Sequence, residues 1–412
     1  MIGLLRHREF SLLWWGGLIS VAGDWILIAV LPYVVYVRTG STIATAGMTV
    51  AELVPGILLG SLAGVLVDRW DRQRVMVIVN LLQAPAVLAL LLLTTNPRFL
   101  PVVYVVAAAQ SVLASFSLPA ESSLLPTLVE HDDLVSANAL NLLNNRIGRL
   151  AGLPLGPVLY AAGGLDVVAM VDAASFALAA LLIAAIRIPP TAPVDAREDP
   201  EPRVLAQWRD GLALVGRDRS IRVLFVVFGL MTFGGTMLDP LAAPWVRDIL
   251  HGGDDVYALL MTVHAGAGIC GSLLVGALGA RLSPRTLCGA GSALAGTVLL
   301  VRFNVPILAV AIVLSLVSGI TSVGSSVGVE TLTQQRVPAT HRGRVFGALQ
   351  ATIWTSSLLG AALGGAGAEL IGLAGMLDIA SCLVLAAGIV VLLALPKPVP
   401  ADLSPAQPET SP

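Results

Sequence analysis

Apolar residues run through the chain in long stretches, separated by short segments that contain charge, glycine or proline. Twelve of these stretches are about 20 residues or longer, which is enough for an α-helix to cross the hydrocarbon core of a bilayer. They cover residues 11–37, 42–67, 74–95, 99–118, 134–161, 165–187, 220–247, 254–280, 285–303, 306–330, 343–369 and 371–395. The pattern predicts an all-α membrane protein with twelve transmembrane helices, and the short connections predict that consecutive helices are antiparallel.

One long polar segment separates the sixth apolar stretch from the seventh. Its first part is rich in proline and charge, and its last part, residues 204–219, is amphipathic and is expected to lie on the membrane surface. A proline-rich polar tail follows the last stretch and is expected to be disordered. The chain therefore divides into a bundle at 1–187, a linker at 188–219, a second bundle at 220–395 and a tail at 396–412.

Positive charge is distributed unequally between the two sides of the predicted membrane protein. If the N-terminus is cytoplasmic, 18 of the 24 Lys and Arg residues fall on the cytoplasmic side and 4 on the outer side, while Arg146 and Arg149 lie within the fifth stretch. Cytoplasmic loops of membrane proteins carry such an excess. The distribution predicts a multi-pass membrane protein with both termini in the cytoplasm.

The two halves share landmarks at a constant offset of 212 residues. The matching positions in the first half are Gly17, Gly23, Pro32, Gly40, Gly56, Gly64 and Arg69, and each has an identical residue 212 positions later. Asp172 and Asp378 also match, at an offset of 206. Coincidence in a glycine-rich chain is the alternative, but duplicated six-helix halves with a binding site between them are common in transporters.

Composition excludes several other classes of function. The net charge of −2 and the charged content of 12% argue against nucleic-acid binding. The three cysteines lie in apolar stretches without metal-ligand spacing, and no phosphate-binding loop of the type G-x-x-x-x-G-K-[ST] is present, so no metal, cofactor or ATP is expected. Five scattered histidines without an H-E-x-x-H motif also argue against an enzyme.

The segment between the second and third stretches holds five charges in seven residues, namely Asp68, Arg69, Asp71, Arg72 and Arg74. If this segment is a cytoplasmic turn between two membrane helices, its arginines are expected to contact lipid headgroups. Such a turn does not explain the two aspartates. We call these five residues together with Gly64 the charged turn.

The charged turn resembles the loop motif G-x-x-x-D-R-x-x-R-x-R of the major facilitator superfamily, although position 71 is Asp where the superfamily usually has glycine. Other stretches are similar to the enterobactin-exporter and macrolide-efflux-like branch of that superfamily. They are FSLLWWGGLISVAGDW (10–25), LPAESSLLPTLVEHDDLVSANAL (118–140) and TQQRVPATHRGRVFG (333–347). The resemblance implies two pseudo-symmetric six-helix bundles and export of a small molecule.

The resemblance also implies a role for the charged turn as a conformational latch. Gly64 would allow the second helix to approach the eleventh closely, and Asp68 would face the start of the eleventh helix, near Arg342 and Arg344. The turn's three arginines would pair with its aspartates or with other cytoplasmic acids. Gly276 is the counterpart of Gly64, so the repeat predicts that the eighth helix packs on the fifth with Gly276 at a close contact. Ala280 replaces the aspartate in the second half. Arginines that merely set topology are the alternative.

Ionisable residues at membrane depth are costly and are usually functional. Asp24 and Glu52 are expected near the midplane of the first and second helices, with Arg146 and Arg149 at similar depth in the fifth. These four could form a static ion network, or at least one acid could exchange a proton during transport. Further proton-coupling candidates are His264, the counterpart of Glu52, and Asp239. His264 could equally be a packing residue.

A polar stripe in the fifth stretch is expected to line a wet cavity. Asn138, Asn141, Asn145 and Arg149 follow one another at helical spacing. Trp25 could stack on a substrate there or act as an interfacial anchor.

Together with the resemblance, these features predict a monomeric secondary transporter of a bacterial inner membrane that exports a small amphipathic molecule, driven by proton influx, by alternating access. An importer or uniporter of a metabolite is the first alternative. A membrane sensor or scaffold that binds a ligand without moving it is the second.

Overall fold

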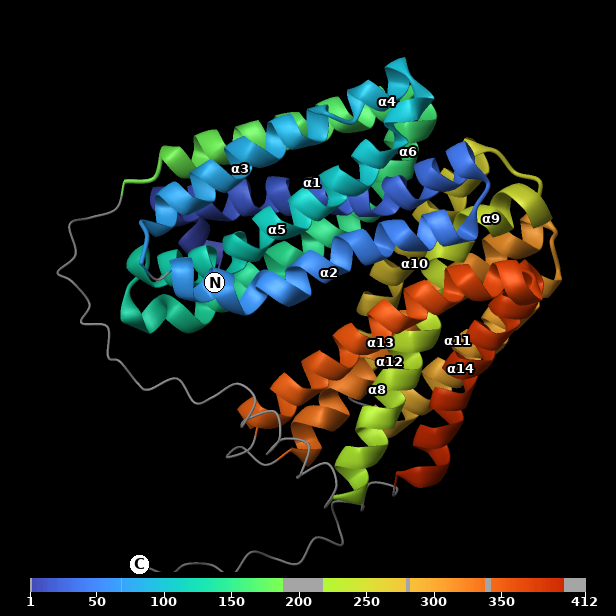
Figure 1. Ribbon diagram of the computed structural model, residues 1–412. Helices are drawn as coiled ribbons and strands as arrows, with labels where there is room; N and C mark the ends of the chain where they lie inside the picture. The colour runs from blue at the N-terminus through green and yellow to red at the C-terminus, as the bar shows by residue number, and fades with distance from the viewer. Residues whose placement is uncertain (1, 68, 188–217, 279–281, 338–341, 396–412) are drawn as a thin grey trace, which may run out of the picture.

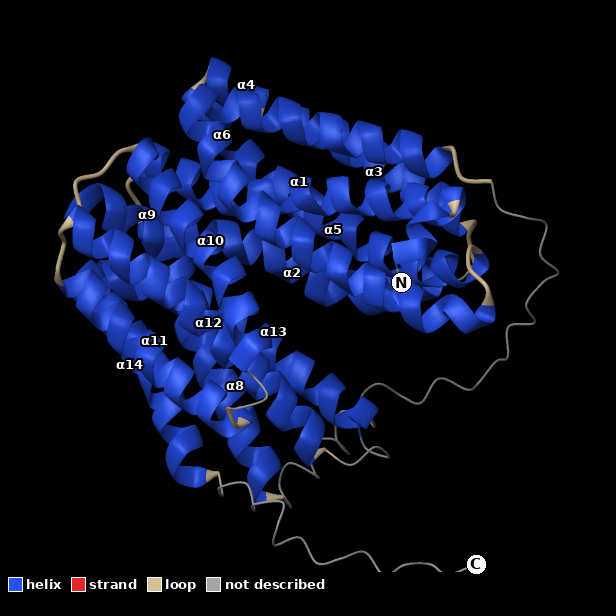
Figure 2. Cartoon of the chain, turned by 180° about the vertical axis from the view of Figure 1, so that it is seen from behind, coloured by secondary structure: helices blue, strands red, loops and turns tan. Residues whose placement is uncertain are grey.

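The computed structural model describes residues 2–67, 69–187, 218–278, 282–337 and 342–395, and within these ranges the chain is helical, without strands (Figure 2). The amphipathic stretch expected at 204–219 falls almost entirely outside the described residues, and the tail at 396–412 lies wholly outside them. The helices of the first half are α1 (Arg8–Thr39), α2 (Thr42–Val67), α3 (Arg72–Leu88), α4 (Leu91–Thr95), α5 (Leu100–Leu124) and α6 (Leu134–Ala184). Those of the second half are α8 (Arg219–Leu238), α9 (Ala242–Pro244), α10 (Asp254–Leu278), α11 (Pro284–Asn304), α12 (Leu308–Arg336), α13 (Arg342–Ile371) and α14 (Leu373–Ala394).

Eleven helical stretches of the described chain are long and apolar enough to cross a membrane. One of them, α6, is 51 residues long and contains a break at Gly163 and Gly164, where Gly164 has a φ of 68°. Glycine adopts this left-handed backbone conformation without the steric cost that a side chain brings. The break divides α6 into two spans, so the described residues contain twelve, the number that the hydropathy pattern predicts.

The helix starts repeat between the halves, which supports the duplication. Helix α2 begins at Thr42 and α10 at Asp254, while α3 begins at Arg72 and α11 at Pro284, so both pairs differ by 212 residues. The repeat is therefore a property of the helices as well as of the glycine positions.

The two halves approach each other at one end and diverge toward the other (Figure 1). We call the end with Thr39, Asp254 and Ile371 the closed end, and the end with Val67 and Arg219 the open end. Helix α2 packs on α13 and α10 packs on α6, the helix pairs that the repeat predicts. These contacts hold the halves together across the pseudo-symmetry.

The prediction that Gly64 and Gly276 are close-contact positions is wrong for this conformation. A Cβ atom built on either glycine meets no atom within 4 Å. The close approach of α2 and α13 lies instead at the closed end, where a Cβ on Gly365 would come within 2.3 Å of Ala46 Cβ and 2.5 Å of Thr42 O. The reason is that the helices splay toward the open end, which separates Gly64 from α13.

The seventh span is irregular on the side that faces the closed end. Helix α8 ends at Leu238 and is followed by a 3₁₀ turn η5 (Asp239–Leu241), the short α9 and a π-helix η6 (Trp245–Ile249). Pro240 and Pro244 lack the N–H group that a regular helix needs at these positions. Interrupted helices are typical of spans that line binding sites in transporters.

Candidate functional site

A cavity of about 810 Å³ lies between the halves, which is within the size range of small-molecule sites. Its walls come mainly from α1, α2 and α5, and α13 contributes the wall from the second half. The polar and aromatic residues that line it are Asp24, Trp25, Glu52, Gln110, Ser111, Ser115, Ser122, Asn145, Trp354 and Ser357. Most of the remaining lining is aliphatic, so the cavity suits a molecule with a large apolar surface.

Asp24 and Glu52 are the two charged residues that line this cavity in the described chain. Helix packing fixes the direction of Asp24. The preceding Gly23 lies against α6 so closely that a Cβ there would fall 2.1 Å from Asp172 Oδ1. That contact turns one face of α1 toward α6 and leaves Asp24, one residue further along the chain, at the cavity wall.

The static ion network, one of the two alternatives for Asp24, Glu52, Arg146 and Arg149, is absent from the described residues in this conformation. Arg146 pairs instead with Glu330 on α12, at 3.6 Å, and this ion pair bridges the two halves. The guanidinium carbon of Arg149 lies 4.6 Å from the ring centroid of Trp25 in a cation–π contact. No ion pair joins either cavity acid to an arginine within the described residues. The cavity therefore holds two carboxylic groups without a paired cation.

The asparagine stripe contributes only partly to the cavity. Asn145 lines it, whereas Asn138 and Asn141 are absent from its wall. The amide nitrogens of Asn138 and Asn145 donate to carbonyl groups one turn earlier, Leu134 O at 2.9 Å and Asn141 O at 3.2 Å. Of the three asparagines in this stripe, only Asn145 therefore reaches the cavity.

The two coupling candidates of the second half occupy different surroundings. Asp239 is exposed and lies in η5, near enough to Glu52 and Arg149 to interact with both electrostatically. His264 lies outside the cavity lining, in α10, close to Arg302. Asp239 therefore belongs to the electrostatic surroundings of the cavity, and His264 belongs to a separate cluster inside the second half.

A network of tyrosines and charged residues joins the halves at the closed end. Tyr33 Oη donates to Asp254 Oδ1 at 2.6 Å and accepts from Arg247 Nε at 2.9 Å, while Arg247 also pairs with Asp254. Tyr36 donates to Asp248. We call these five residues the closing network. The closing network links α1 to η6 and α10, and it closes the cavity on that side of the protein.

Two further contacts close the same end between α2 and α13. Thr42 Oγ1 donates to Gly365 O at 2.8 Å, and Ser41 Oγ donates to Glu369 Oε1 at 2.8 Å. Because these bonds cross from one half to the other, they must break if this end opens.

The charged turn is partly ordered by Asp71. Its carboxylate accepts from Arg74 N at 2.9 Å as the N-cap of α3, and lies 3.7 Å from Arg74 Nε. An N-cap carboxylate explains why aspartate suits a position where related sequences have glycine. Neither Arg69 nor Arg72 makes an ion pair within the described chain. Asp68 lies outside the described residues, as do the side chains of Arg342 and Arg344, so the latch stays a prediction.

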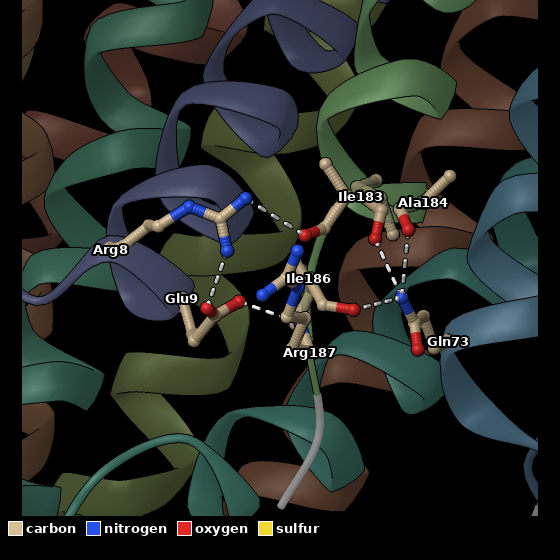
Figure 3. Close-up of polar contacts among 8 residues, drawn as sticks. Arg8, Glu9, Gln73, Ile183, Ala184, Ile186 and Arg187 are labelled. Atoms are coloured by element: carbon tan, nitrogen blue, oxygen red, sulfur yellow. Dashed lines mark hydrogen bonds and ion pairs between the residues drawn. The ribbon is translucent and has the colours of Figure 1, made fainter.

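Next to the charged turn, polar contacts fasten the last turn of α6 (Figure 3). Gln73 Nε2 donates to Ile183 O and Ile186 O, each at 2.9 Å. Glu9 accepts from Arg187 N at 2.7 Å. These bonds therefore join the first, third and sixth spans at the open end.

The sequence reading missed several residues of the site. Gln110 and Ser111 on α5 and Trp354 on α13 line the cavity, and Glu121 on α5 is buried against Gly17. Uncharged polar residues at membrane depth are too common to be singled out from one sequence. Glu121 was missed because the predicted stretch ends at residue 118, whereas α5 continues to Leu124.

A family model described as transmembrane secretion effector (MFS_3) matches residues 2–412. The chain belongs to this family. It is therefore a membrane transporter with the major facilitator fold, which agrees with the resemblance carried by the charged turn.

Curated relatives of this chain include efflux proteins. It is 26% identical over 400 residues to the uncharacterized MFS-type transporter YfiS of Bacillus subtilis, covering 91% of this chain and 90% of the relative. Macrolide efflux protein A of Streptococcus pyogenes is 24% identical over 66% of this chain and 67% of its own. The enterobactin exporter EntS of Citrobacter koseri is 26% identical over 89% of this chain and 86% of its own.

Solved structures with the same fold include a bacterial homologue of the iron transporter ferroportin in two states. The inward-facing structure superposes with a TM-score of 0.69 at 19% identity, covering 94% of this chain and 98% of the other. The outward-facing structure has a TM-score of 0.54 at 18% identity, covering 93% and 98%.

Proposed function

We propose that this transporter exports small amphipathic molecules across a bacterial inner membrane in exchange for protons, by alternating access. The observation that carries the proposal is the cavity between the halves, in which Asp24 and Glu52 are present without a paired arginine. An unpaired carboxylate is costly at membrane depth, whereas a protonated carboxyl or one neutralised by a bound cation is far less so. Proton and substrate can therefore compete for the same groups.

On the basis of the arginine distribution, we propose that the open end and both termini are cytoplasmic, which would make this conformation an inward-facing state. The higher TM-score to the inward-facing than to the outward-facing ferroportin homologue agrees with this assignment. In this state an exporter takes up its cargo from the cytoplasm. The closing network and the α2–α13 bonds then have to break, while the charged turn approaches α13 as the latch.

The lining of the cavity favours an amphipathic cation as cargo. Its only charged lining residues in the described chain are acids, and Trp25 and Trp354 offer aromatic faces from opposite halves. Aromatic faces and carboxylates are the groups that attract organic cations in proteins. Export of a macrolide by one relative and of enterobactin by another, as their names state, supports an efflux role without fixing the cargo.

Proteoliposomes with the membrane potential clamped at zero test the proposal, with tetraphenylphosphonium as cargo. We expect accumulation against its gradient when a pH gradient is imposed, and loss of accumulation on addition of a protonophore. Glu52→Gln or Asp24→Asn should fold and exchange cargo but no longer concentrate it. Asp166→Asn, which changes an exposed carboxylate on α6 away from the cavity, is the control.

The outcomes also separate the alternatives. Downhill flux that ignores the pH gradient would indicate a uniporter, and binding without any flux would indicate a sensor or scaffold. Accumulation that survives both substitutions would place proton coupling outside these two carboxyl groups, with Asp239 as the next residue to change.

A further inference from the structure

Arg149 is a cation beside the transport cavity that contacts an aromatic ring instead of an acid. Its guanidinium carbon lies 4.6 Å from the ring centroid of Trp25, and Trp25 lines the cavity. No ion pair involves Arg149 within the described chain, although Asp239 of the second half lies within electrostatic range. The ring on which an organic cation is expected to lie is therefore already in contact with a cation of the protein.

Close packing of α6 on α1 keeps Arg149 at this ring. Gly148 and Gly152 lie on either side of Arg149 in the sequence. A Cβ atom on Gly148 would come within 3.3 Å of Ala22 N, and one on Gly152 within 2.3 Å of Ala22 O. The Cβ atom on Gly152 would also fall 2.6 Å from the Cβ atom of Trp25. Because both helices belong to the first half, this proximity of Arg149 to Trp25 is expected to persist when the halves move.

A second cation gains little from a ring that already holds one. The attraction of a cation to an aromatic ring comes from the negative charge at the ring face. A cation on the face that Arg149 covers is excluded sterically. A cation on the opposite face is repelled by the guanidinium charge, because only the thickness of the ring separates the two charges. Binding of an organic cation at Trp25 is therefore opposed for as long as Arg149 remains on the ring.

We propose that Arg149 competes with cationic cargo for the Trp25 ring and is a specificity-determining residue of the cavity. The inference rests on the proposed export of organic cations. Arg149 is attached to the chain and loses no translational freedom on contact with the ring, whereas free cargo does. Cargo displaces Arg149 only if it also buries apolar surface against the aliphatic lining of the cavity. Arg149 thereby excludes small, strongly hydrated cations and admits large amphipathic ones.

Isothermal titration calorimetry of tetraphenylphosphonium binding to the purified protein in detergent tests this competition. Arg149→Gln should bind the phosphonium about fivefold more tightly than the wild type, which is the scale of one cation–π contact. Removal of a residue that holds the cargo would weaken binding instead. The variant is expected to fold, because Arg149 is exposed and has no ion pair to lose. Arg98→Gln, which changes an exposed arginine outside the cavity lining, should leave the affinity unchanged.

A double-mutant cycle separates competition for the ring from simple electrostatics. Removing any positive charge near Asp24 and Glu52 strengthens their attraction for a cation, whether or not a ring is present. Trp25→Leu removes the ring and keeps an apolar side chain. Competition predicts that Arg149→Gln improves the affinity by less than about twofold in the Trp25→Leu background, which is the limit within which independent substitutions add. Electrostatics alone predicts the same gain in both backgrounds.

The possible results distinguish this inference from the proposed function. Unchanged or weaker binding by Arg149→Gln would overturn the competition and leave the cationic cargo standing. The same applies to a full gain in the Trp25→Leu background, or to binding that is measurable in that background only when Arg149 is also replaced. No binding by either the wild type or Arg149→Gln would contradict the cationic cargo and the competition together, whereas binding by Arg149→Gln alone would support both. Should Arg149→Gln not fold, Arg149→Met replaces it in the same comparisons.

Discussion

At the scale of single residues, Asp24 and Glu52 define the chemistry of the cavity because the arginines nearby are engaged elsewhere. Arg146 pairs with Glu330, and Arg149 lies on the face of Trp25. A cavity with acids and aromatic faces should distinguish molecules by the sign of their charge more than by their shape.

Tetraphenylphosphonium and tetraphenylborate test this selectivity, since they have nearly the same size and apolar surface but opposite charge. We expect the purified wild-type protein to bind the phosphonium and to bind the borate at least about tenfold more weakly, a difference of roughly 1.4 kcal/mol. Glu52→Gln should reduce the preference for the phosphonium. Isothermal titration calorimetry in detergent measures both ions without any transport step.

Equal or tighter binding of the borate would contradict the assignment of a cationic cargo. It would leave the transport proposal standing, because an exporter of neutral or anionic molecules can use the same cavity. Loss of all binding in Asp166→Asn, the exposed control, would instead show that the assay reports on folding.

The residues show where sequence reading succeeds and where it does not. The acids were predictable because a charge inside an apolar stretch is conspicuous, and both line the cavity. Their partners were not predictable. The position of Arg149 along its helix predicts that it lies at a depth similar to that of Asp24. The direction of its side chain toward Trp25 depends on the packing between α1 and α6. Trp354 gave no signal, because aromatic residues in membrane helices are usually anchors.

At the scale of helices, the α2–α13 pair carries glycines with opposite surroundings. Gly365 lies in tight contact with Ala46 and Thr42, whereas Gly64 has free space around it. Both belong to an interface that the duplicated sequence predicts. The sequence does not say which end is closed, because both conformations must be compatible with the same residues.

The two glycines should therefore respond differently to a bulky side chain. Gly365→Leu should prevent closure at Thr42 and shift the protein toward the outward-open state, since a Cβ alone already collides there. Gly64→Leu should leave the present conformation intact and prevent closure of the open end. Both should lower transport by at least about tenfold, a barrier change of roughly 1.4 kcal/mol.

Accessibility of single cysteines to a membrane-impermeant maleimide, applied from each side, distinguishes the two variants. Opposite shifts in labelling are expected, and each variant serves as the control for general damage to folding. Normal transport by Gly64→Leu would exclude a close α2–α13 approach at that position in any state of the cycle.

At the scale of the whole molecule, alternating access requires the two halves to rotate relative to each other about the cavity, so that one end closes as the other opens. The closing network and the bonds from Ser41 and Thr42 lie at the closed end, and the ion pair of Arg146 with Glu330 is a further contact between the halves, from α6 to α12. At the open end, a Cβ atom built on Gly64 meets no atom within 4 Å, so α2 does not contact α13 closely at this position. Asp68→Asn should therefore weaken closure of the open end while leaving the present conformation intact.

The most direct measurement uses pulsed dipolar spectroscopy on spin labels at both ends of the same helix pair, in lipid. One pair of labels replaces Ile43 on α2 and Leu370 on α13 near the closed end, and the other replaces Leu66 on α2 and Phe346 on α13 near the open end. All four side chains are exposed. Alternating access predicts that cargo and a change of pH lengthen the first distance and shorten the second, and that Asp68→Asn reduces the shortening. Two distances that change in the same direction, or do not change at all under conditions of active transport, would contradict it.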